Sequence, residues 1–148
     1  MNIISSKDNE LIKNIKKLKE KKYRDINNQY IIEGIKLIKE AIIEKANIKL
    51  IVICEECLVD GTIDKNLLYE IAKYECIYVT EKIFTQISDV KAPQGILAII
   101  EKGCKQGQID YSEDIIIALD GIQDPGNLGT ILRTVDSANL KQIIVSAD

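Results

Sequence analysis

The chain has 148 residues and is 46% hydrophobic, which suffices for one well-packed core or for one small domain plus part of another. It has no run of about twenty apolar residues, and residues 7–22 are too polar for a signal peptide, so a soluble, cytoplasmic protein without a membrane segment is expected. The net charge of −3 does not indicate nucleic-acid binding, but its distribution is uneven, because residues 1–24 carry +5 and the remainder −8.

A basic helix is predicted near the N-terminus. Apolar residues recur at helical spacing, lysines fill the other faces, and the pattern ends near residues 23–25. The apolar stripe comprises Leu11, Ile15 and Leu18. A basic segment on an acidic body can bind phosphates, and the candidates are Lys16, Lys17, Lys22 and Arg24. The alternative is an ordinary solvated helix face.

Strands and helices then alternate along the chain. The predicted strands cover residues 29–32, 49–53, 77–79 and 96–100, the last after a Pro-Gln-Gly turn. The predicted helices begin at Gly34, at Asp64 as an N-cap and at Glu81, and the helix after Gly34 buries Ile35, Ile38, Ala41, Ile42 and Ala46. This alternation predicts an α/β fold with a mostly parallel or mixed sheet between helices.

An interdomain linker is predicted next. Residues 101–114 contain two glycines, several charges and no apolar period. We therefore expect a first domain at 1–103, a linker at 104–113 and the start of a second domain at 114–148.

The second domain opens as strand, glycine-rich loop, helix and strand. Residues 115–119 are a β-branched run, and Asp124 followed by Pro125 is a helix start, although Asn127 can cap instead. The predicted buried helix face comprises Leu128, Ile131, Leu132 and Val135. The free backbone donors of such a helix start suit an anionic or polar ligand, and the alternative is an ordinary strand-to-helix turn.

Arginine is scarce in this chain. Of twenty basic residues only Arg24 and Arg133 are arginines, which favours a specific use of the rigid, bidentate guanidinium at both positions. The loop before Arg133 matches neither a dinucleotide-binding glycine fingerprint nor a P-loop.

Residues 119–139, LDGIQDPGNLGTILRTVDSAN, resemble the first signature motif of the SpoU (TrmH-like) family of RNA ribose 2′-O-methyltransferases in the SPOUT superfamily. The matching positions are Asp120, Gly121, Asp124, Pro125, Asn127, Gly129, Thr130 and Arg133. The resemblance implies methyl transfer from S-adenosylmethionine to a ribose hydroxyl of rRNA or tRNA, with Asn127 and Arg133 as catalytic residues facing the RNA. The alternatives are a helix cap for Asn127 and an ion pair with Asp136 for Arg133.

Residues 22–41, KYRDINNQYIIEGIKLIKEA, resemble the substrate-binding domain that precedes the methyltransferase domain in many SpoU proteins. Arg24, Glu33 and Gly34 match that pattern, which implies RNA binding and the three-layer α/β fold of kink-turn-binding ribosomal proteins. Glu33 can hydrogen-bond a base edge, or it is simply an exposed glutamate.

The second domain is expected to be incomplete. About 35 residues are too few for a core, and the resemblance implies two further motifs that form the cofactor site within a trefoil knot. Neither motif is present, so the cofactor site is expected beyond Asp148 and the chain is expected to be an inactive fragment of a methyltransferase. The resemblance also implies a homodimer through the knotted domain. A non-catalytic RNA-binding module is the alternative.

Cys54 and Cys57 have the C-x-x-C spacing of zinc and thiol-redox sites. Zinc would need Cys76 and Cys104, which lack paired spacing, and redox chemistry would need the pair to open a helix, whereas residues 58–61 indicate a turn. No metal site is predicted, and a metal or redox protein remains a third hypothesis.

Overall fold

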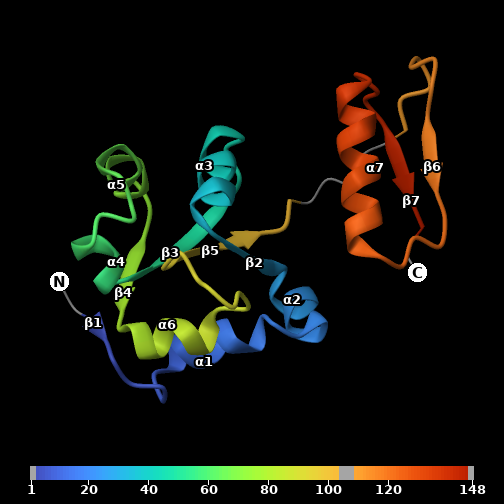
Figure 1. The fold of residues 1–148 in the computed structure, drawn as a ribbon. Helices are drawn as coiled ribbons and strands as arrows, with labels where there is room; N and C mark the ends of the chain where they lie inside the picture. The colour runs from blue at the N-terminus through green and yellow to red at the C-terminus, as the bar shows by residue number, and fades with distance from the viewer. Residues whose placement is uncertain (1–2, 104–108, 147–148) are drawn as a thin grey trace. The chain divides into compact units, whose positions relative to one another are not determined.

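The protein is represented by a computed structural model that describes residues 3–103 and 109–146 (Figure 1). Its contacts divide the chain into two compact units, Met1–Cys104 and Lys105–Asp148, and each is described by itself. Residues 104–108 of the predicted linker, Cys104 among them, lie outside the described residues. In the stretches that the structure describes, no helix is long and apolar enough to cross a bilayer.

The first unit contains one five-stranded mixed sheet. The strands are β1 (Ile3–Ile4), β2 (Gln29–Glu33), β3 (Ile48–Cys54), β4 (Cys76–Val79) and β5 (Ile96–Glu101), in the order β1-β4-β3-β5-β2. β4 runs parallel to β1 and β3, whereas β5 is antiparallel to β3 and β2. The mixed α/β sheet is confirmed, but β1 was not predicted, because two residues show no alternation.

Helices cover both faces of this sheet. They are α1 (Glu10–Lys17), α2 (Lys21–Asn27), α3 (Ile35–Ile43), α4 (Glu56–Val59), α5 (Lys65–Ile71) and α6 (Glu81–Ile87). Figure 1 shows α1 and α6 on one side of the sheet and α3 and α5 on the other. The side chains of Leu50 and Val52 pack with α1 and α6, whereas Ile51 and Ile53 pack with α3 and α5. β3 is apolar from Leu50 to Cys54, after the exposed Lys49, because a helix layer lies on each side of it. The predicted three-layer arrangement is confirmed.

The prediction of one continuous N-terminal helix is wrong. α1 ends at Lys17 and α2 begins at Lys21, with a tight turn between them. The Arg24 guanidinium donates hydrogen bonds to the carbonyl oxygens of Leu18 and Lys19, so these groups are satisfied without a continuing helix. The buried stripe also differs, because Ile12 is fully buried and Leu11 only half-buried.

The second unit contains one β-α-β motif. It comprises β6 (Ile117–Leu119), α7 (Pro125–Ser137) and β7 (Ile143–Val145), with β6 and β7 parallel. β6 starts at Ile117, two residues later than the predicted strand. On α7, Val135 is buried but Leu132 is 43% exposed, so the prediction of a buried Leu132 is wrong. A sheet of two strands is too narrow to cover the whole apolar stripe of a helix of this length.

Candidate functional site

Glu33 and Gly34 lie where β2 ends and α3 begins. Gly34 has φ +104°, a backbone conformation that favours glycine, and occupies the N-cap position. The side chain of Gln94, from the Pro-Gln-Gly turn, accepts a hydrogen bond from the Ile35 amide at 2.9 Å. This turn therefore caps a helix that is remote from it in sequence.

Both carboxylate oxygens of Glu33 accept hydrogen bonds from within the protein. Ser88 Oγ donates to one at 2.6 Å, and the Asp89 amide donates to the other at 3.2 Å. Lys19 Nζ binds the same loop, at 2.8 Å from the Ser88 carbonyl oxygen and 2.9 Å from the Asp89 carboxylate. Glu33 thus orders the loop after α6 and is not simply an exposed glutamate. Its contact with a base edge stays a prediction.

The basic candidates lie on α1 and α2, the helices that precede β2. We call the set Lys16, Lys17, Lys22, Tyr23 and Arg24 the α1–α2 face. The Nζ atoms of Lys17 and Lys22 each lie 5.9 Å from the centroid of the Tyr23 ring. Lys16 Nζ donates to Gln86 Oε1 at 2.6 Å, so part of its donor capacity is used internally. Arg24 is half-buried and closes the turn between the helices. Tyr23 was missed, although an aromatic residue among lysines is a nucleic-acid signal.

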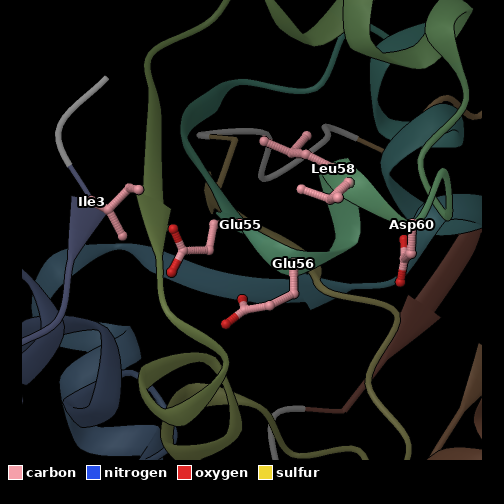
Figure 2. A pocket seen from close by; sticks show the side chains of 6 residues that line it. Ile3, Glu55, Glu56, Leu58 and Asp60 are labelled. Atoms are coloured by element: carbon pink, nitrogen blue, oxygen red, sulfur yellow. The ribbon is translucent and has the colours of Figure 1, made fainter.

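A pocket of about 630 Å³ lies at the end of β3, beside β1 (Figure 2). Its apolar part comes from Ile3, Leu58 and Val59. Three carboxylate residues also line it, Glu55, Glu56 and Asp60. This negative charge repels phosphates, so the pocket is a poor site for nucleic acid.

The Cys54–Cys57 pair lies close to that pocket. The prediction of a turn at residues 58–61 is wrong for residues 58 and 59, which belong to α4. This helix follows β3 directly and contains Cys57. Cys54 Sγ donates to Glu56 Oε2 at 3.0 Å. Burial raises the pKa of the Cys54 thiol to about 12, with the hydrogen bond to Glu56 adding to it, and burial also raises the pKa of Cys57. Among the described residues no cluster of His, Cys, Asp or Glu is arranged to hold a metal ion.

We expect both thiols to react slowly with iodoacetamide in the folded protein at pH 8. A raised pKa lowers the thiolate fraction at that pH, and only the thiolate is the nucleophile, so labelling should accelerate as pH rises. Peptide mass spectrometry against the same protein in urea measures this. Equally fast labelling of folded and unfolded protein would revive the redox hypothesis.

In the second unit, Asp124 begins α7 as predicted. Its Oδ1 accepts a hydrogen bond from the Asn127 amide at 2.8 Å, so Asp124 and not Asn127 is the cap. A Cβ on Gly126 would lie 2.9 Å from that same oxygen, so the close cap suits glycine there. The Asn127 residue is exposed, and its side chain does not act as the helix cap.

Arg133 is exposed, and its guanidinium points back along α7. Nη2 lies 3.4 Å from Thr130 Oγ1, and Nη1 lies 3.7 Å from the position of a Cβ on Gly129. Within the described chain Arg133 makes no ion pair with Asp136, so that alternative is wrong. Asn127 and Arg133 are six residues apart, about 9 Å along the helix axis, and do not contact each other. Any ligand that both contact must span that distance.

The start of α7 is open to solvent. The N-cap Asp124 and the first turn of α7 up to Asn127 are exposed throughout, whereas a bound cofactor has most of its surface buried. A cavity of about 490 Å³ lies at the start of β7, away from the loop that follows the end of β6, and includes Asp110, Lys141 and Gln142 in its lining.

Comparison with known proteins gives matches over nearly the whole chain. A family model described as MRM3-like substrate binding domain matches residues 9–98. The 23S rRNA (guanosine(2553)-2′-O)-methyltransferase RlmP of Bacillus subtilis is 29% identical over 98% of this chain and 54% of its own length. A solved RNA 2′-O ribose methyltransferase aligns with a TM-score of 0.76 and 25% identity, covering 99% of this chain and 56% of the solved one.

A further solved structure, an AdoMet-bound rRNA methyltransferase from Sinorhizobium meliloti, has a TM-score of 0.74 and 28% identity, covering 99% of this chain and 55% of the solved one. The chain therefore spans about half the length of these relatives. The resemblance to SpoU methyltransferases is confirmed.

Proposed function

Given that the chain belongs to the family of MRM3-like substrate-binding domains, we propose that its first unit binds RNA for a ribose 2′-O-methyltransferase domain that begins in its second unit. The supporting observation is that the similarity to RNA methyltransferases runs through both units, over 98% of the chain in the Bacillus relative. We propose ribosomal RNA as the substrate, with transfer RNA as the alternative.

We propose S-adenosylmethionine as the methyl donor of the whole protein, because a solved relative contains it. Because the first turn of α7 is exposed, we assign the residues of this chain only to the RNA side of the site. Arginine stays protonated at any ordinary pH, so Arg133 binds an RNA phosphate and stabilises negative charge on the ribose oxygen. Asn127 donates and accepts hydrogen bonds at once, which suits orienting the ribose.

The 148-residue chain alone is expected not to bind S-adenosylmethionine. The exposed first turn of α7 supplies too little buried surface for a stable complex. Isothermal titration of the purified chain should give no heat beyond dilution. Stoichiometric binding would show that the chain forms a cofactor site by itself or by pairing, and would remove the reason for assigning it to the RNA side alone.

Neutralising the lysines of the α1–α2 face is expected to weaken RNA binding and its salt dependence. With Lys16→Gln and Lys17→Gln combined, the magnitude of the slope of log K against log salt should fall by about 2, about 1 for each lysine, because fewer counterions are released. Arg24→Ala should also weaken binding, since the turn that positions Lys17 and Lys22 depends on it. Fluorescence anisotropy with a labelled RNA stem–loop measures these effects.

A matched control is available on the opposite face of the sheet. Lys36 and Lys65 lie exposed on α3 and α5, and their double change to Gln alters the net charge equally. This control should keep the wild-type salt slope. Equal losses in both double variants would mean that net charge alone, and not the α1–α2 face, determines RNA affinity.

A non-catalytic RNA-binding module is the second candidate, favoured by the exposed first turn of α7 in the second unit. Methyl transfer to RNA by the product of the complete gene distinguishes the two. We further propose a cytoplasmic location and a homodimer of the whole protein, which size-exclusion chromatography with light scattering tests.

A further inference from the structure

A smaller cavity, of about 250 Å³, lies between α1, the end of α2 and the start of β2. Its apolar lining includes Leu11, Leu18 and Ile99, and its polar lining consists of Asn14, Lys17, Asn27 and Gln29. Ligand pockets typically measure about 300–1,000 Å³. This cavity therefore suits one small, flat group rather than a larger ligand.

Three side-chain amides stand round the cavity, and two of them are free to bind a ligand. Asn27 uses its Nδ2 to donate to the Tyr23 carbonyl oxygen at 2.8 Å, which leaves its Oδ1 as an acceptor. In the described parts of the chain, the side chains of Asn14 and Gln29 make no hydrogen bond to another residue. Each thus offers both a donor and an acceptor.

The charge beside the cavity is positive. Lys17 lines it, and Lys22 approaches the Tyr23 ring at the same 5.9 Å as Lys17 does. Within the described residues neither lysine has a carboxylate partner. The larger pocket of Figure 2 has the opposite character, since three carboxylate residues line it. Phosphates are therefore attracted to the small cavity and repelled from the large one.

We propose that this cavity holds the base of one unpaired RNA nucleotide, with the adjoining phosphates on Lys17 and Lys22. This inference rests on the proposed RNA-binding function and names the part of the RNA that is read. Amides pair with the donors and acceptors of base edges, the leucines contact the flat face of the base, and only a base turned out of a helix can enter. A duplex has no such base to offer.

The proposal is tested with the intact chain and two single-stranded RNA probes of equal length and charge, one of uridines or adenosines and one abasic. The wild-type protein should bind the base-containing probe about tenfold more tightly. The double variant Asn14→Leu and Gln29→Leu should lose this preference while keeping the salt slope, because no charge has changed.

Two further variants make the outcome specific. Asn66→Leu, an exposed amide on α5 on the opposite face of the sheet, should bind both probes as the wild type does. Asn14→Asp preserves the shape of the side chain and should also lose the preference for the base-containing probe. The test can therefore be decided even if the leucine variant fails to fold. Side-chain amide NMR signals of Asn14 and Gln29 should shift with uridine or adenosine monophosphate.

The outcomes separate this inference from the proposed function. Binding of both probes with equal affinity by wild type and variants would overturn the base site while leaving RNA binding intact. Absence of binding to any RNA would overturn the proposed function itself, and the base site with it.

Discussion

Replacing Gly95 with alanine is expected to destabilise the protein by about 3 kcal/mol. A Cβ at this position would lie 2.1 Å from Cys57 Sγ and 2.7 Å from Cys57 Cβ, far inside contact distance, and the backbone has φ +72°. The Gly95 carbonyl oxygen also accepts a hydrogen bond from the Cys54 amide at 2.8 Å, so the turn cannot move away freely. Urea unfolding followed by circular dichroism measures the loss.

Gly61 provides a matched control for this change. It has nearly the same backbone angle, φ +75°, but no atom lies within 4 Å of an added Cβ. Gly61→Ala should therefore cost only the backbone strain, about 1 kcal/mol. In a Cys57→Gly background the cost of Gly95→Ala should shrink. Equal costs at the two glycines would show that packing against Cys57 is not the cause.

In a protein with the complete methyltransferase domain, Arg133→Ala is expected to lower kcat/KM for methyl transfer by roughly 100-fold to 1,000-fold. Binding of S-adenosylmethionine should be unchanged, because Arg133 is assigned to the RNA side. The change leaves α7 intact, since among the described residues the guanidinium makes only one long hydrogen bond, to Thr130 at 3.4 Å.

Two variants near Arg133 serve as controls. Asp136→Asn should retain nearly full activity, because Asp136 makes no ion pair with Arg133 in the described chain. Arg133→Lys should recover only part of the activity, since lysine keeps the charge but lacks the bidentate geometry. Normal turnover in Arg133→Ala would remove the role assigned to this residue.

Local patterns predicted most of the fold. Asp124 was identifiable as a cap because an N-cap acts on backbone amides within its own first turn. The register of α1 was less certain, because Leu11 and Ile12 both fit a helical stripe. Packing against the sheet and α6 buries Ile12 fully and leaves Leu11 at the flank.

The contacts of the candidate site were harder to predict because they join distant segments. Glu33 and Ser88 are 55 residues apart, and no local spacing links them. Arg24 illustrates a second difficulty. The scarcity of arginine in the chain indicated a specific role for Arg24, but it did not indicate that Arg24 closes the turn between α1 and α2. The amides of the 250 Å³ cavity come from α1, α2 and β2, so only the folded structure shows that they form one set.

The strand order has a consequence for how the chain acquires its structure during synthesis. Among the described strands, β2 lies at an edge of the sheet and pairs only with β5, and β1 pairs only with β4. The first two strands to emerge from a ribosome, β1 and β2, can therefore pair only after β4 and β5 have been synthesised. Such pairings between remote segments form slowly. We expect a nascent chain released before residue 101 to be protease-sensitive around residues 29–33, because β2 has its pairing partner only when β5 is complete.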